Sequence, residues 1–213
     1  MDNTVLYDLT YGLYAIGVKD GERNCGCIVN TVFQISGEGP IIALSMNKDN
    51  YTYELIKRNK KFSVSILSEE SDPTVINKLG FVSGKDNDKW DGFSFEEMDG
   101  LPIVKDHVLG QMICEVETMS ETTTHFVILA KVVNAQKDSK GVAMTYSYYH
   151  NVIKGKAPKK APTYREEDTN VEAKESWVCT VCGYVYDGPD FNAESEDYVC
   201  PICGVPKMMF EKR

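Results

Sequence analysis

The chain has 213 residues, of which 42% are hydrophobic and 26% charged, and its formal net charge is −9. These values exclude a disordered chain and leave room for one or two domains whose cores need no disulfides. The acidic balance argues against nucleic-acid binding, no apolar run reaches the roughly 18 residues of a membrane helix, and no secretion signal follows Met1, so we expect a cytoplasmic protein.

Residues 1–155 have patterns that predict mostly β-strands. Apolar residues alternate with polar ones, or run together, in four segments that we expect to be strands: 11–19, 27–36, 41–46 and 62–67. A helix is expected over 50–59, where Asn50 can act as the N-cap. A second, shorter helix is expected to begin at Pro73 and to end at Gly80.

The rest of this region predicts further strands. A polar loop at 83–92 precedes two long segments rich in Val, Ile and Thr, 110–119 and 124–135, which we expect to pair as antiparallel strands. A last strand is expected over 143–149. Because strands do not alternate with helices, the fold class is mainly β, an antiparallel barrel with short helices.

The seven cysteines are unevenly distributed, and four of them lie in the last 35 residues. An odd number of cysteines without an export signal does not suggest a disulfide framework. Cys179-x-x-Cys182 and Cys200-x-x-Cys203 are separated by 17 residues, and two such pairs can place four thiolates in a tetrahedron around zinc or iron. The other three are expected to be buried or partly buried free thiols: Cys25, Cys27 and Cys114.

A change in composition divides the chain. Residues 156–174 contain two prolines, nine charged residues and few large apolar ones, which is typical of a linker. We therefore expect a first domain over 1–155, this linker, and a cysteine module over 175–213. The module has seven acidic and three basic residues, a net charge of −4, which predicts a partner contact that weakens with salt.

The cysteine module resembles the rubredoxins. Residues 177–187 (Trp-Val-Cys-Thr-Val-Cys-Gly-Tyr-Val-Tyr-Asp) resemble their first half and residues 200–210 their second half, although the spacer is shorter than in ordinary rubredoxins. The resemblance implies one iron held by four thiolates, those of Cys179, Cys182, Cys200 and Cys203. It also implies a small core of four aromatic rings: Trp177, Tyr184, Tyr186 and Phe210. A structural zinc ribbon is the alternative, because it uses the same ligand spacing.

A one-electron metal centre needs an electron source, so we looked for a cofactor site in residues 1–155. It is not a Rossmann or Walker site, because neither motif occurs. Polar segments interrupt the predicted strands instead: 30–34, 45–52 and 83–89. The second segment runs into the predicted start of a helix, where backbone N–H groups and the helix dipole favour a phosphate. Lys48, Lys85 and Lys89 could add positive charge. From the pattern alone, ordinary loops explain these segments equally well.

These segments, in this order, resemble the flavin reductase-like FMN-binding split barrel, through residues 26–34, 47–52, 83–90 and 124–128. Together with the rubredoxin-like module, the whole arrangement resembles the high-molecular-weight rubredoxins. The resemblance implies a split barrel that binds FMN at a homodimer interface. It also implies NAD(P)H as the electron donor and a flavodiiron-type protein, which reduces oxygen or nitric oxide, as the acceptor.

The resemblance further implies which residues hold FMN. Two correspond to positions along the isoalloxazine edge: Asn30 and Thr31. Five correspond to the ribityl and phosphate segment: Ser45, Asn47, Lys48, Tyr51 and Thr52. Five correspond to the loop that closes over the phosphate: Ser83, Gly84, Lys85, Asp86 and Lys89. Two histidines correspond to late positions near the cofactor: His125 and His150.

No general acid or base is expected, because hydride chemistry is intrinsic to the flavin. The linker is expected to let the module meet the flavin and then a partner protein. Two other functions stay open at this point. The chain could be an electron carrier whose flavin is reduced by another protein, or a binding protein in which a barrel carries a structural zinc ribbon.

Overall fold

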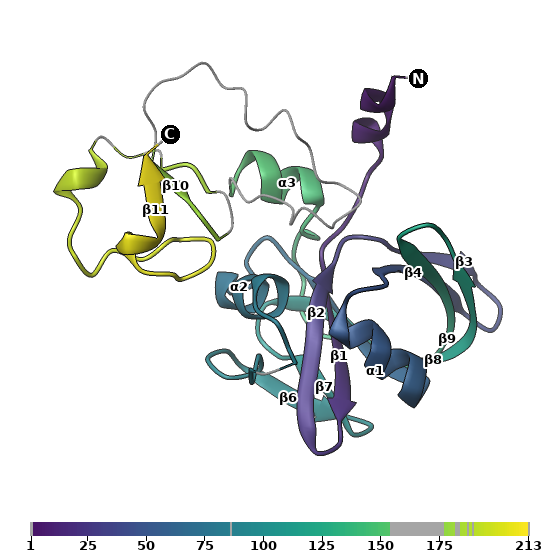
Figure 1. Cartoon of the computed structure of the whole chain (residues 1–213). Coiled ribbons are helices and arrows are strands. Elements are labelled where there is room, and N and C mark those ends of the chain that lie inside the picture. The colour runs from purple at the N-terminus through teal and green to yellow at the C-terminus, as the bar shows by residue number, and fades with distance from the viewer. Residues whose placement is uncertain are drawn as a thin grey trace.

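The computed structural model describes residues 2–85, 87–153, 177–181, 184–186, 188 and 190–212 (Figure 1). The expected linker at 156–174 lies outside these residues, as do Asp86 and Cys182. Among the residues described, no helix is long and apolar enough to cross a membrane.

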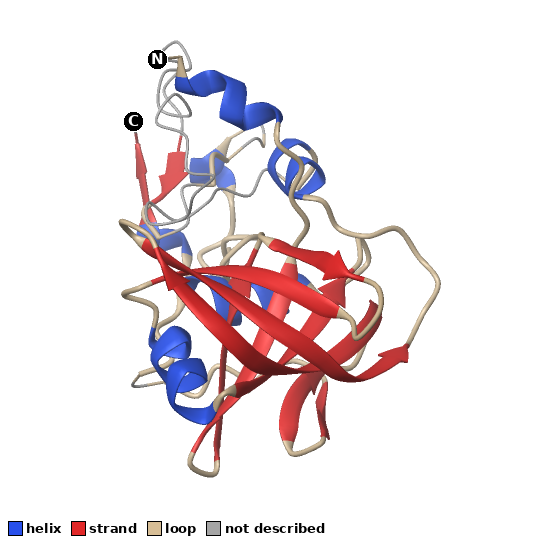
Figure 2. Cartoon of the chain, turned by 90° about the vertical axis from the view of Figure 1, so that its right-hand side faces the viewer, coloured by secondary structure: helices blue, strands red, loops and turns tan. Residues whose placement is uncertain are grey.

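Seven strands form one antiparallel sheet with the order β2-β1-β5-β8-β9-β4-β3, and Figure 2 shows how strongly this sheet curves. Their bounds are β1 Tyr14–Asp20, β2 Arg23–Val29, β3 Val32–Ser36, β4 Ile41–Asn47, β5 Lys61–Leu67, β8 Val108–Glu121 and β9 His125–Lys137. β2 and β3 follow one another in the chain but lie at opposite edges of the sheet. The chain therefore passes from one edge of the curved sheet to the other between them, and the prediction of a mainly β fold is confirmed.

Alternation along β1 explains why the barrel has two cores. Successive side chains of a strand point to opposite faces. Ile16 and Val18 accordingly join a cluster inside the barrel, the inner core, with residues of α1 (Tyr51–Asn59). Leu13 and Ala15 join a second cluster, the outer core, with residues of α2 (Pro73–Phe81). The sheet is thus buried on both faces at β1.

The two predicted helices form where their capping residues indicated. The Asn50 side chain accepts a hydrogen bond from the Thr52 N–H at 2.9 Å at the start of α1. Asp72 does the same for Thr74 at 2.8 Å before Pro73 in α2. Such caps satisfy N–H groups that have no partner within the helix. α2 continues through Gly80 to Phe81, so the predicted end is one residue short.

Two strand predictions are wrong in part. The segment 27–36 is not one strand, because the chain changes pairing partner at Asn30–Thr31: β2 pairs with β1 and β3 with β4. The expected strand over 143–149 is mostly the short helix α3 (Tyr146–Asn151), preceded by isolated bridges at Ala143 and Thr145. The Thr145 hydroxyl caps this helix by accepting from the Tyr148 N–H at 3.0 Å.

Three short elements were not predicted. A 3-10 helix, η1, spans Asn3–Asp8, and β6 (Phe95–Met98) forms a hairpin with β7 (Leu101–Val104). The hairpin follows the polar loop after α2, and its strand β7 packs against β1.

The cysteine module is a separate small unit around its own core. β10 (Trp177–Cys179) pairs with β11 (Phe210–Lys212), and two short 3-10 helices, η3 (Phe191–Ala193) and η4 (Lys207–Met209), lie between them in sequence. Figure 1 shows the module beside α2 and α3. In this part of the chain the buried side chains are mostly aromatic rings and cysteines.

Candidate flavin cavity and metal centre

A cavity of about 420 Å³ opens where several element ends meet. The start of α1, the ends of β2 and β4, the end of α2, the loop after it and α3 all contribute to its wall. This volume is within the usual range for small-molecule and cofactor sites.

Most of the residues expected to hold FMN line this cavity: Asn30, Ser45, Asn47, Tyr51, Thr52, Ser83, Gly84, Lys89 and His125. Apolar and aromatic residues form the rest of the wall: Leu13, Cys27, Ile28, Val29, Met46, Ile76, Leu79, Phe81, Val82, Tyr146 and Tyr149. The cavity therefore has a polar side near the start of α1 and an apolar side between α2 and α3. FMN, with a phosphate at one end and a flat ring system at the other, matches that division.

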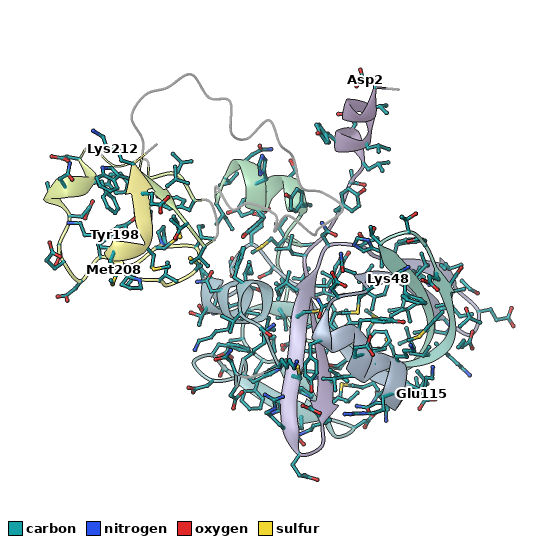
Figure 3. All side chains as sticks on the ribbon, in the orientation of Figure 1. Asp2, Lys48, Glu115, Tyr198, Met208 and Lys212 are labelled. Atoms are coloured by element: carbon teal, nitrogen blue, oxygen red, sulfur yellow. The ribbon has the colours of Figure 1, made fainter. Side chains whose placement is uncertain are left out.

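Four expected residues lie elsewhere in the described part of the chain. The Thr31 hydroxyl donates to Asn30 Oδ1 at 3.0 Å. Lys48 forms an ion pair with Glu121 and lies over the Phe126 ring at 5.7 Å (Figure 3 labels it on the barrel). Lys85 is exposed, and the His150 ring stacks on Tyr146 at 6.0 Å. A role for these side chains in binding the cofactor remains a prediction.

The start of α1 gives the cavity a site for an anion. Asn50, Tyr51 and Thr52 line the wall where the first backbone N–H groups of this nine-residue helix emerge. The Thr52 N–H is already bonded to the Asn50 side chain, so the attraction for a phosphate comes mainly from the positive end of the helix dipole. Just before the helix, the Asn47 side chain accepts from the Asp49 N–H at 2.9 Å and shapes the turn.

Lys89 is a buried cation in the cavity wall. The residue is only 3% exposed, and its Nζ donates to the carbonyls of Gly26 at 2.8 Å and Leu79 at 2.6 Å. Burial lowers the pKa of this amine. Among the residues described, no carboxylate pairs with it. Its charge is balanced mainly by carbonyl dipoles, so an anion in the cavity would be stabilised.

Glycine fits position 84 because the buried Cys25 thiol lies against it. A Cβ at this position would lie 2.7 Å from Cys25 Sγ and 3.1 Å from Lys89 Cδ. A larger residue would therefore force the loop or the thiol to shift beside Lys89.

Asp20 fastens the loop 83–89 and Tyr51 to the turn between β1 and β2. It accepts hydrogen bonds from Arg23 at 2.7 Å, from the Tyr51 hydroxyl at 2.8 Å and from Arg58 at 3.1 Å. These donors lower the pKa of Asp20 to about 2. Arg23 also donates to the carbonyl of Lys85 at 3.2 Å, so the same network orders the loop.

The barrel thiols are buried and free, as predicted. Cys27 lies in the cavity wall, and burial raises its pKa to about 11. Cys114 lies in the inner core, and burial raises its pKa to about 12. Such thiols are protonated at neutral pH and are poor nucleophiles.

The module brings together three of the four predicted metal ligands, and the fourth, Cys182, lies outside the described residues. The Sγ atoms of Cys179, Cys200 and Cys203 all lie within 4.8 Å of one another. Those of Cys179 and Cys203 are 3.4 Å apart. A tetrahedral site with metal–sulfur bonds of about 2.3 Å places sulfurs about 3.8 Å apart, so these thiols fit a metal.

The turns around the thiols are fixed by backbone hydrogen bonds. The Cys179 N–H donates to the Tyr184 carbonyl and the Cys200 N–H to the Val205 carbonyl, both at 2.8 Å. Gly204 has a φ of +66°, a conformation that glycine adopts without strain. The two cysteine turns thus have matching geometry.

Phe191 is the centre of the module core and was missed by the sequence reasoning. Its ring contacts those of Trp177 and Phe210, each at 4.7 Å, and that of Tyr186 at 5.0 Å. The predicted rings Trp177, Tyr184, Tyr186 and Phe210 all belong to or pack on this core. The aromatic residues of the spacer, Phe191 and Tyr198, were the available signal.

Comparison with known protein families gives two matches that divide the chain. Residues 6–155 match the family described as "Flavin reductase like domain". Residues 177–211 match "Rubrerythrin, rubredoxin-like domain".

Curated relatives share one or both parts. The chain is 39% identical to a high molecular weight rubredoxin of Moorella thermoacetica, over the full length of both proteins. It is 32% identical to a ferric-chelate reductase (NAD(P)H) of Archaeoglobus fulgidus, over 78% of this chain and 99% of that protein.

A solved structure has the same barrel fold. The NADH:FAD oxidoreductase of Streptomyces globisporus superposes with a TM-score of 0.59 at 17% identity, covering 66% of this chain and 83% of that one. At this identity the likeness shows the fold alone.

Proposed function

The chain belongs to the high molecular weight rubredoxins, oxidoreductases that join a flavin reductase-like domain to a rubredoxin-like domain. On that basis we propose that it takes hydride from NADH or NADPH onto FMN and passes the electrons singly through an Fe(Cys)4 centre to another protein. The observation that carries this proposal is the presence, in one chain, of an FMN-sized cavity with a polar and an apolar side and of a cluster of convergent cysteine thiols.

A bound flavin would supply hydride acceptance and the release of two electrons one at a time, and an Fe(Cys)4 site would accept one electron with little ligand movement. The protein's own residues bind and orient. We assign the FMN phosphate to the start of α1 and the ring to the apolar wall. Lys89 lines the same cavity, and its buried positive charge would favour the anionic cofactor.

FMN rather than FAD is proposed on the resemblance of residues 26–34, 47–52, 83–90 and 124–128 to the FMN-binding split barrels. The ligands of iron are Cys179, Cys200, Cys203 and, by sequence, Cys182. Iron rather than zinc is supported by the rubredoxin-like match and by the aromatic core around Phe191, which resembles rubredoxins beyond the cysteines.

The domain division that we propose is a flavin domain over 1–155, a linker over 156–174 and a rubredoxin-like domain over 175–213. The family matches at 6–155 and 177–211 support it. Free thiols and a thiolate metal site suit a reducing compartment, so we place the protein in the cytoplasm.

We further propose a homodimer. Edge strand β3 exposes Phe33 at 57% and Ile35 at 51%, and Val133 on β9 is 42% exposed. Large exposed apolar side chains near one another mark association surfaces. Asn30, two residues before β3, lines the cavity, so a dimer formed through β3 would bring a second chain close to the flavin.

The electron acceptor that we propose is a flavodiiron-type protein, which would use the electrons to remove oxygen or nitric oxide. The support is the family to which the chain belongs, together with the module's net charge of −4, which suits a partner with a basic surface.

The visible spectrum of the purified protein, with its FMN and iron content, tests this function. We expect overlapping absorption of oxidised flavin and a ferric thiolate centre, and close to one FMN and one iron per chain. A colourless protein that contains zinc would contradict the proposal and would favour a binding protein with a zinc ribbon. Flavin and iron that NADH and NADPH both fail to reduce would favour a carrier reduced by another protein.

A further inference from the structure

Two side chains of the barrel also pack against the cysteine module. Phe81, the last residue of α2, and Ile153, just after α3, are partly buried. Both pack against the outer core cluster of the barrel and against the core cluster of the module. Phe81 also lines the cavity. A single ring is therefore in contact with the candidate flavin site and with the metal-binding module.

The turn that carries Phe81 is held in place from inside the barrel. The last carbonyls of a helix have no partner within the helix, and a cation near them is favoured by the helix dipole. The Lys89 ammonium fills this role by binding the Leu79 carbonyl, and its bond to the Gly26 carbonyl joins the turn to β2. Phe81 is thus presented from a fixed turn.

We propose that the module docks on the barrel of its own chain at this place, with Phe81 and Ile153 as the docking pair, and that Phe81 is the side chain between flavin and iron. This inference rests on the proposed function, because docking here matters for electron transfer only if the cavity holds flavin and the module holds iron.

The size of the contact fits a transient interaction. A stable interface between separate proteins buries roughly 1,200 Å² or more, and two partly buried side chains supply much less. Within one chain the effective concentration of the module is on the order of millimolar, so a weak contact is still populated. Because the docking pair is apolar, the contact is insensitive to salt, whereas the acidic module's contact with a partner weakens with salt.

Photo-cross-linking tests the contact without relying on electron transfer. Phe81 is replaced by p-benzoyl-phenylalanine in the full-length protein, and cross-linked peptides are identified by mass spectrometry after irradiation. We expect cross-links to residues 177–212. Phe95, 39% exposed on β6, is the matched position and should give none to that range.

Mixing protomers labelled with heavy and light isotopes shows which chain supplies the module. Cross-links within one chain support the proposal. Cross-links only between chains, or an equal yield from position 95, overturn it.

Ile153→Ala tests whether this contact supports electron transfer from flavin to iron, because Ile153 packs on the module without lining the cavity. We expect reduction of the iron by the flavin to slow about tenfold, the effect of removing about 1.4 kcal/mol of docking free energy. Val152→Ala, at a neighbouring side chain that is 60% exposed, is the control and should keep the wild-type rate.

Reduction of the flavin by the nicotinamide should be unchanged in both variants, and the Ile153 effect should persist at high salt. An Ile153 variant with the wild-type iron rate contradicts the docking pair. A protein that holds no flavin or iron refutes the proposed function instead, and the cross-linking result stands apart from that failure.

Discussion

The barrel and the cysteine module hold their sites by different means. The barrel has two clusters of buried side chains, drawn from the strands and from both longer helices, and its cavity opens at the edge of that packing. In the described part of the module there is one small cluster, and two of its six buried members, Cys179 and Cys200, are cysteines of the metal centre. A small domain has too little core to be stable alone, so a metal commonly completes it.

This difference predicts how each domain responds when its cofactor or metal is lost. In the barrel, the cofactor occupies a shape that the fold provides, and losing the cofactor should leave the fold intact. In the module, metal binding and folding are the same event, because the thiols converge only in the folded turns. Iron loss should therefore unfold the module and leave the barrel folded.

The largest effect is expected from Cys200→Ser. Metal binding by four cysteines contributes on the order of 10 kcal/mol or more to the folding of a small domain, so this variant should lose both the iron and the ordered module. Iron analysis and the visible spectrum measure the loss. FMN content should stay at the wild-type value.

The matched control is Cys114→Ala, which removes a buried thiol from the barrel core. It should keep its full iron content. If Cys200→Ser released FMN as well, the two regions would not be independent in the way the structure indicates.

Next in size is Phe62→Ala, at a fully buried ring of the inner core. The cavity left behind should lower the free energy of unfolding of the barrel by about 3–5 kcal/mol. Urea unfolding followed by circular dichroism measures this change, while the iron spectrum should persist at urea concentrations that unfold the variant barrel. Val142→Ala, at a side chain that is 63% exposed, should change stability little.

The third-largest effect is expected from Lys89→Met. The carbonyls of Gly26 and Leu79 lose their charged donor, which should cost about 2 kcal/mol of stability. Affinity for FMN should also fall, because the cavity wall loses its buried positive charge. Thermal unfolding and FMN titration measure the two effects.

The exposed Lys140→Met is the control for that variant, and it should change stability by no more than about 0.5 kcal/mol. Unchanged FMN affinity in Lys89→Met would show that the lysine is a purely structural helix cap.

The smallest effect is expected from Asp20→Asn, which weakens three hydrogen bonds and should cost about 1 kcal/mol near neutral pH. The pKa of Asp20 is about 2 in the folded protein, below its ordinary value of 3.8. Its contribution is therefore complete above the ordinary value and is lost as the pH falls towards 2.

Chemical unfolding at a series of pH values should show the difference between wild type and Asp20→Asn shrinking over that acidic range. The exposed neighbour Glu22→Gln should behave as wild type. A difference that stays constant down to the lowest pH would mean that Asp20 does not stabilise the turn through its charge.

Sequence patterns correctly predicted those elements that are determined by residues close to one another in the chain. The caps Asn50 and Asp72, the alternation in β1 and β5, and the spacing of the module cysteines all act over a few residues. Most polar residues of the cavity were also found, because they stand in the three segments that interrupt the strands.

Long-range pairing accounts for what was missed. The alternation through 27–36 continues across Asn30–Thr31, so it could not show that the chain crosses between opposite edges of the sheet there. Tyr146 and Tyr149 satisfy a helical spacing as well as an apolar strand, and the Thr145 cap decides between them. The apolar cavity wall arises only when α2 and α3 meet β2.

The central claim is that electrons entering the barrel leave through the module. Anaerobic mixing with NADH, and separately with NADPH, followed in the visible by stopped-flow, tests it most directly. We predict that at least one nicotinamide bleaches the flavin first and the ferric thiolate band afterwards, and that Cys200→Ser keeps the first phase and lacks the second. Flavin bleaching with no subsequent change in the iron band of the wild-type protein would contradict the account.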